Sequence, residues 1–307
     1  MNENPENKSF IQAIWISSIV AIILGLLLSL LTMGRGSVNL YGMVLFCFFP
    51  IIAGFVVSLF MNKKNSFLIG TLVLFIVLAI LMITQQEGVF CVLMASPLIL
   101  LALFLGILFG SLFNKPNKTL PNLLVVLFLA STLLIGADYA ERPYRNIARV
   151  ESISNSLEVP FTPEEVWPKI ITVDKLSAPK PFLFQVGLPL PLYCTLKGKG
   201  VGAIRICHFE KGTIEERVTE WNPPHRIKVK ITKVDLPNNH WLDFTEASYQ
   251  LTPVAKGTQI TRITRISSKL LPRFYWGILE RWGIESEHRY LLDSVLYSLQ
   301  QAPYQTP

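Results

Sequence analysis

Polar side chains able to do chemistry occur in the C-terminal half of the sequence at positions where hydrophobic residues are expected. The candidates are Arg205, Glu216, Tyr249 and Arg262, which alternate with apolar residues in segments of strand type, and Tyr275 and His288 in the amphipathic segment that ends the chain. A charge buried in an apolar environment must be paired, and burial shifts its pKa. An arginine and a glutamate buried together could therefore orient the carboxylate of a ligand or take part in proton transfer.

The same residues also have a purely structural interpretation. The two arginines and Glu216 could form cross-strand ion pairs on a solvated sheet face, and the two tyrosines could be packing aromatics with a tethered hydroxyl. The inward face near Arg262 is ambiguous, because Ile260, Ile263 and Ile266 do not keep a single alternation. Both interpretations stay open at this point.

The histidines and cysteines do not form a metal site. The four histidines, at positions 208, 225, 240 and 288, lack ligand spacing, and the four cysteines contain no CxxC pair. The sequence also lacks GxSxG, P-loop and GxGxxG motifs, so we expect no metal and no cofactor. Cys194 and Cys207 flank the turn around Gly200. They could form a disulfide if this part of the chain is extracytoplasmic, and are otherwise free core thiols.

The elements that must position the candidates begin near Ile147. Residues 149–159 are a plausible strand, and Thr162 and Glu165, three residues apart with Pro163 between them, are typical of a capping box that opens a short helix through Trp167. Strand-type runs separated by turn residues follow at 184–197, 201–209, 213–221, 226–234, 241–251 and 258–267. Such short connections predict antiparallel neighbours.

A long helix is predicted to follow the strands, over residues 272–301. Its apolar residues fall mostly at helical spacing: Phe274, Ile278, Trp282, Leu291, Leu292, Val295, Leu296 and Leu299. We expect this stripe to pack in the concave face of the sheet. The alternation at 226–231, with one apolar and one cationic face, indicates that the other face of the sheet is solvated.

This order of elements resembles the helix-grip fold of the START and polyketide-cyclase-like superfamily, abbreviated SRPBCC. The local motifs that carry the resemblance are VPFTPEEVW at 159–167, GVGAIR at 200–205, the segment from Gly212 through EWNPP at 220–224, LTP at 251–253 and GTQIT at 257–261. The resemblance covers residues 147–301. The motifs are turns and strand starts, and thus specify the fold better than the activity.

The resemblance implies a cavity between the sheet and the long helix that takes a hydrophobic or amphipathic small molecule. Some members of the superfamily only bind or carry their ligand, whereas others catalyse cyclisation, dehydration or hydrolysis. The fold alone does not choose among these functions. The candidates to contact the ligand are the six polar residues named first: Arg205, Glu216, Tyr249, Arg262, Tyr275 and His288. Glu216, Arg205 and Arg262 are the catalytic candidates.

The composition of the other half differs sharply. The 307 residues have a mean hydropathy of +0.43 and only 16% charged residues, where about 25% is usual. Residues 1–137 contain six Lys or Arg and three Asp or Glu, against 22 and 18 in residues 138–307. Five uncharged segments are long enough to cross a bilayer, at 10–33, 40–61, 66–84, 90–113 and 120–137. We expect an all-α bundle of five membrane helices over 1–139, joined through a polar linker at 140–146 to an α+β domain.

The basic residues of the loops predict an orientation. With five spans, one side collects Lys8, Lys63, Lys64, Lys115 and Lys118, and the other short loops hold only Arg35. The positive-inside rule then places the N-terminus in the cytoplasm and the C-terminal domain outside it. The three arginines at 142, 145 and 149 oppose this assignment.

The leading hypothesis is a multi-pass membrane protein whose C-terminal domain binds a hydrophobic small molecule or lipid close to the bilayer, more a binding protein than an enzyme. Two alternatives stay open. One is an enzyme acting on an apolar substrate, and the other is an assembly protein whose cavity is filled by its own aromatic side chains. Basic residues do not interleave with aromatics as a nucleic-acid groove requires, so no nucleic-acid partner is expected.

Overall fold

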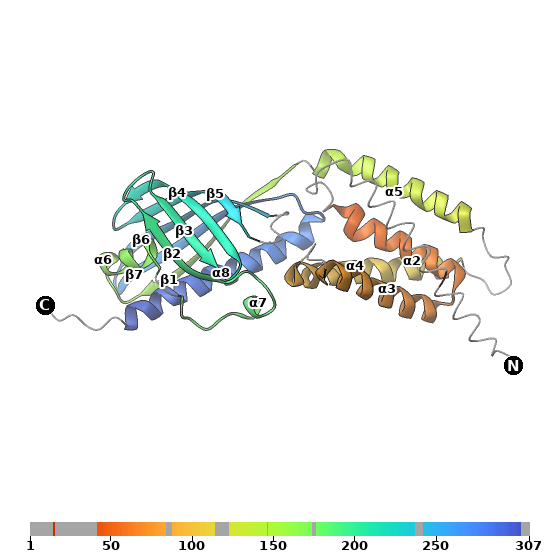
Figure 1. The fold of residues 1–307 in the computed structure, drawn as a ribbon, viewed down its shortest axis with the longest axis horizontal. Coiled ribbons are helices and arrows are strands. Elements are labelled where there is room, and N and C mark those ends of the chain that lie inside the picture. Colours follow the sequence, from red (N-terminus) through yellow and green to blue (C-terminus); the bar gives the residue numbers. More distant parts are fainter. Residues whose placement is uncertain are drawn as a thin grey trace. The chain divides into compact units, whose positions relative to one another are not determined.

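The chain forms two compact units in a computed structural model. The structure describes Trp15 and residues 42–83, 88–113, 123–145, 147–173, 176–236 and 242–301. One unit comprises the residues up to Ile147 together with Lys269–Arg273, and the other comprises Ala148–Ser268 and the chain from Phe274. Figure 1 shows that the first is helical and that the second combines a sheet with a long helix.

The helical unit contains three helices that are long and apolar enough to cross a membrane, within α3 (Lys63–Ile83), α4 (Val89–Ser111) and α5 (Leu123–Arg145). They correspond to the third, fourth and fifth expected spans. The second span is shorter than expected, because η2 (Val44–Phe48) and α2 (Phe49–Phe60) together cover only Val44–Phe60. The first, at 10–33, lies outside the described residues. Five membrane helices are thus not shown.

Close contact between α2 and α4 depends on small residues. A Cβ atom at Gly106 would overlap the backbone of Ile51, and one at Gly110 would overlap Ser58 Oγ and the backbone of Phe55. The GxxxG spacing therefore serves packing inside this unit. Near the end of α5, Glu141 accepts hydrogen bonds from the backbone N–H groups of Met43 and of Val44, the latter at 3.1 Å.

The second unit is built on one antiparallel sheet of seven strands in the order β1-β7-β6-β5-β4-β3-β2. The strands are β1 (Arg149–Val159), β2 (Pro191–Lys197), β3 (Ile204–Phe209), β4 (Gly212–Asn222), β5 (Arg226–Asp235), β6 (Leu242–Val254) and β7 (Gly257–Ser268). The expected strand at 184–197 begins later, since Phe182–Gln185 form the short helix α7. The number of strands and their antiparallel pairing agree with the prediction.

Helix α6 (Pro163–Ile171) begins with the predicted capping box, in which Thr162 Oγ1 accepts from Glu165 N while Glu165 Oε2 accepts from Thr162 N at 2.7 Å. The helix does not end at Trp167 as predicted. It continues through Pro168 to Ile171. Together α6 and the second half of α8 (Arg273–Gln301) pack on the sheet. The apolar core at this contact consists of Val159, Val166, Trp167, Ile170, Ile171, Ala203, Val218, Ile227, Val229, Ala247, Tyr249, Leu251, Ile260, Leu292, Val295 and Leu299.

The first half of α8 does not bury the face that its sequence pattern predicts. Phe274, Ile278 and Trp282 are 75%, 70% and 43% exposed, respectively. The side that is buried instead carries two acidic residues, Glu280 and, at the midpoint of the helix, the mostly buried Glu287. This polar side of the helix is buried because it supplies the hydrogen-bond and ion-pair partners of the inward-facing polar residues of the sheet.

Candidate functional site

Strand β7 brings a row of polar side chains to the inner face of the sheet. Its even-numbered residues, Thr258, Ile260, Arg262, Thr264, Ile266 and Ser268, are all buried. Every polar member of this row has a partner: Thr258 donates to Phe161 O at 2.7 Å, Arg262 and Thr264 contact α8, and Ser268 donates to Glu280. Four of the six inward residues are thus polar, and the strand runs antiparallel to the helix that pairs with it.

Arg205 and Glu216 form a buried ion pair between neighbouring strands. They are opposite each other in the register of β3 and β4, with Nη1 and Oε2 separated by 2.7 Å, and are only 4% and 5% exposed. Arg205 also donates to the carbonyls of Ile171 at 3.1 Å and Ile170 at 3.3 Å, at the end of α6. The pair lies inside the domain, so the interpretation as an ion pair on the solvated face is wrong.

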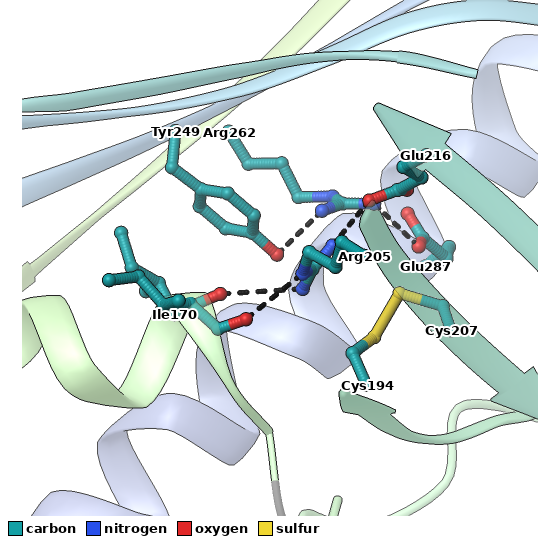
Figure 2. The surroundings of a disulfide bond; sticks show 9 residues. Ile170, Cys194, Arg205, Cys207, Glu216, Tyr249, Arg262 and Glu287 are labelled. Atoms are coloured by element: carbon teal, nitrogen blue, oxygen red, sulfur yellow. Dashed lines mark hydrogen bonds and ion pairs between the residues drawn. A yellow bond between two sulfur atoms is a disulfide. The ribbon is translucent and has the colours of Figure 1, made fainter. Parts of the chain in front are cut away.

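Arg262 occupies the centre of the candidate site. Its Nη1 donates to the hydroxyl of Tyr249 at 2.5 Å, its Nη2 pairs with Glu287 Oε1 at 2.8 Å, and its guanidinium lies 4.9 Å from the centre of the Tyr249 ring. The third donor, Nε, is buried and has no hydrogen-bond partner among the described residues. Figure 2 shows the two arginine side chains converging on the same region between Tyr249 and the two glutamates, although β3 and β7, which carry them, are not adjacent in the sheet.

The electrostatics of this group are balanced. Two arginines face two glutamates, so the group is neutral when all four are ionised. Burial raises the pKa of Glu287, and the neighbouring Arg262 opposes that rise. Burial lowers the pKa of Arg262, but Glu287, Tyr249 and Glu216 together raise it above its usual value, which keeps the guanidinium charged. Balanced pairing makes this many charges tolerable in the interior.

His288 is also a buried residue of the helix. Its ring nitrogens lie 2.7 Å from Thr264 Oγ1 and 2.8 Å from Asn155 Oδ1, and the side chain is completely buried. Burial, assisted by the charge of Arg262, lowers the pKa of His288 to about 2. His288 is therefore neutral, bridging β1 and β7 to α8.

The structure brings five of the six candidates into the interior of the domain: Arg205, Glu216, Tyr249, Arg262 and His288. Tyr275 differs, since it is only half-buried and packs edge-on against Trp276. Sequence reasoning missed Glu287 and Asn155. Glu287 lies seven residues after Glu280 and four before Leu291, on the same side of α8. Two acidic residues on the side that also carries Leu291 were the signal from which Glu287 could have been predicted.

Cys194 and Cys207 lie beside the Arg205–Glu216 pair. They are opposite in the register of β2 and β3 and are joined in a disulfide, while Cys47 and Cys91 are not disulfide-bonded. Arg205 and Cys207 share the inner face of β3, as Figure 2 shows. Within the described ranges, no group of three or more His, Cys, Asp or Glu side chains is arranged to hold a metal ion.

Comparisons with known proteins find a family model that matches the part of the chain that carries these residues. Residues 151–292 match the family described as polyketide cyclase / dehydrase and lipid transport. Similar solved structures include norcoclaurine synthase from Thalictrum flavum (14% identity, 53% of this chain and 94% of that chain, TM-score 0.36) and a protein from Chromobacterium violaceum (15%, 48% and 96%, 0.35). A third is the Aha1 dimer from Colwellia psychrerythraea (16%, 50% and 98%, 0.32). No curated protein matches the sequence significantly.

Proposed function

We propose, from the premise that residues 151–292 form a domain of the polyketide cyclase / dehydrase and lipid transport family, that this domain binds a hydrophobic small molecule or lipid while the helical unit anchors it in a membrane. The observation that carries the proposal is the buried polar group around Arg262 within an otherwise apolar interior. Ligand sites commonly combine apolar walls with a few convergent polar groups. The three membrane-length helices support the anchor.

The hydrogen bonding of Arg262 narrows the class of ligand. Both glutamates are paired with arginines, so the polar group has no excess charge to attract an anion or a cation. The donor without a partner is Arg262 Nε, and a buried donor costs free energy until it finds an acceptor. We therefore expect a neutral amphipathic ligand with one carbonyl, ester or hydroxyl oxygen that accepts from Nε.

Ligand binding is tested on the full chain, purified in mild detergent and extracted with organic solvent for mass spectrometry. The protein is then reloaded from vesicles containing radiolabelled diacylglycerol or, separately, radiolabelled fatty acid. We expect co-purified lipid, and at least tenfold preference for the neutral probe. Failure to recover any lipid, both natively and after reloading, would contradict the binding function and favour an interior filled by the protein's own side chains.

A conservative variant tests the role of Nε. Arg262→Lys keeps a cation next to Glu287 but removes the Nε donor, so the loading of the neutral probe should fall about tenfold. Arg265→Lys is the matched control, because Arg265 lies on the same strand with its side chain 52% exposed. Equal loading of both variants would show that Nε does not contact the ligand.

A second candidate function is catalysis on an apolar substrate. The raised pKa of Glu287, caused by burial, favours it, because a carboxyl whose pKa is shifted toward the operating pH is better suited to act as a general acid. Glu216 would then be the base, with Arg262 or Tyr249 orienting the substrate. Turnover of a bound ligand that is lost in both Glu287→Gln and Glu216→Ala would support this function, whereas unchanged ligand after prolonged incubation would favour binding alone.

The domain is proposed to lie on the extracytoplasmic side. The lysine-rich loops favour this orientation, and so does the Cys194–Cys207 disulfide, because disulfides persist in oxidising compartments and are rare in the cytosol.

A further inference from the structure

The first three turns of α8 expose an apolar stripe formed by Phe274, Ile278 and Trp282, which are 75%, 70% and 43% exposed. Their spacing of four residues places them on one side of the helix in successive turns. Exposed hydrophobic residues that occur singly need no explanation, but a contiguous row of large ones marks an interaction surface. We refer to these three residues as the α8 stripe.

Chain connectivity limits the distance between the α8 stripe and the last apolar helix. The segment of α5 that is apolar enough to cross a membrane ends at Tyr144, and three residues later the carbonyl of Ile147 accepts a hydrogen bond of 2.7 Å from Arg273. Three residues span at most about 11 Å when fully extended. Since Arg273 directly precedes Phe274, the stripe begins within a short distance of the end of the helix, whatever the orientation of the domain.

A second tether holds the middle of the α8 stripe. Arg149, five residues after Tyr144, pairs with Glu280, which lies between Ile278 and Trp282 in sequence. Five residues reach at most about 18 Å. The interfacial layer on each side of a bilayer is about 5–8 Å thick. A surface held this close to the end of a membrane helix lies within reach of that layer.

We infer that the α8 stripe inserts into the boundary between headgroups and acyl chains of the bilayer that holds α5, as an interfacial helix face. The chemistry of the stripe fits this occupant. Amphipathic helices bury Trp, Phe and aliphatic residues a few ångströms below the headgroups, and aromatic residues concentrate at this depth. The flanking residues fit as well, because Arg273 and Arg281 lie at polar positions next to the stripe.

The inference rests on the membrane anchoring proposed above and is independent of what the domain binds. Fluorescence quenching by brominated lipids tests it on the full chain in lipid nanodiscs. The contribution of Trp282 is the difference in emission between the wild type and Trp282→Phe. Bromines at the sixth and seventh acyl carbons should reduce this contribution at least twofold. The contribution of Trp167, which is buried in the domain, is measured through Trp167→Phe and should not change.

Two further outcomes are informative. Ile278→Ser should weaken the quenching of Trp282, whereas Val201→Ser, which alters an exposed apolar residue of a hairpin, should leave it unchanged. A protein that enters the nanodisc but shows no quenching of Trp282 overturns the inference while leaving the membrane anchor intact. Efficient disulfide cross-linking of Ile278→Cys to a second copy also overturns it, because the stripe would then be a dimer contact.

Discussion

Arg205 makes more buried contacts than its cross-strand pair requires. One guanidinium neutralises Glu216 and satisfies two carbonyls at the end of α6, which would otherwise have no intrahelical partner. The side chain thus joins the sheet to α6. Its loss would leave both a buried carboxylate and unsatisfied backbone groups.

Arg205→Leu should therefore lower the free energy of unfolding of the C-terminal domain by about 3–5 kcal/mol, the usual cost of removing one partner of a buried pair. The double variant Arg205→Leu/Glu216→Leu should recover part of this loss, because no uncompensated charge remains. Urea unfolding followed by near-ultraviolet circular dichroism measures both. A double variant as unstable as the single one would show that the carbonyl contacts, not the charge pair, dominate.

The buried His288 predicts a dependence of stability on pH. Its pKa is about 2 in the folded protein and about 6.5 when unfolded, so between these values only the unfolded state binds the proton. Stability contributed by neutral His288 is complete above pH 6.5 and is lost as the pH falls, by about 1.4 kcal/mol per pH unit. The measurement is the urea midpoint of the domain between pH 7 and pH 5.

The control for this prediction is His288→Asn, which keeps a hydrogen-bonding side chain between Thr264 and Asn155 but cannot titrate. Both proteins contain Glu287, so its contribution cancels in the comparison. The raised pKa of Glu287 makes stability fall as the pH rises, which is opposite to the effect of His288. The variant should be less stable at pH 7 and should lose less stability on acidification. Identical slopes for the two proteins would mean that His288 is protonated in the folded domain.

The candidate site could be predicted from the sequence only in part. Arg205 and Glu216 stand out because they interrupt alternating apolar residues. The inward face of β7 could not be identified from hydrophobicity, because four of its six inward residues are polar and Ile263 lies on the other face. Glu287 was missed for a related reason, since an acidic residue on a helix is normally assigned to solvent.

The capping box at the start of α6 is a local feature that the sequence predicts well, because all its partners lie within four residues. Thr162→Ala removes the acceptor for Glu165 N and should lower the free energy of unfolding by about 1 kcal/mol. Thr172→Ala is the control at the other end of this helix, where the hydroxyl donates to Pro168 O at 3.3 Å. We expect it to cost less than half as much in the same urea titration, and a larger effect at Thr172 would contradict the importance of the cap.

Other elements depend on contacts that are distant in sequence. The limits of β1 and of α8 agree closely with the apolar patterns at 149–159 and 272–301. The buried side of α8 differs from the side that the apolar pattern predicts, because it is determined by contacts with Ser268, Thr264 and Arg262 on β7. Helical periodicity of apolar residues identifies the buried side of a helix only when the surface that it packs against is apolar. The sheet surface beside the first half of α8 is polar.

The division into two units follows from composition. Uncharged segments of about 20 residues can satisfy their backbone only as helices within a bilayer, and the charged half has the content of an ordinary soluble domain. The expected count of five spans exceeds the three helices of membrane length among the described residues. The segment at 40–61 reaches the required length in apolar residues, but its helical part is shorter.

The sidedness proposed for the domain rests on a bilayer crossing by each of these three helices. Lys64 lies at the start of α3, and one crossing each by α3, α4 and α5 would put Lys64 and the C-terminal domain on opposite sides. The cytoplasmic side is assigned to Lys64 by the loop charges. In the proposed orientation the Cys194–Cys207 disulfide lies on the extracytoplasmic side, in agreement with its chemistry.

Cysteine labelling in sealed right-side-out vesicles checks this arrangement. In a background with Cys47→Ser and Cys91→Ser, a membrane-impermeant maleimide should label Lys256→Cys, at an exposed hairpin turn, without lysis. Lys64→Cys, also exposed, should react only after the vesicles are opened. The reverse pattern would place the domain in the cytoplasm, where the disulfide would not persist. Equal labelling of both without lysis would mean that one of the three helices does not cross the bilayer.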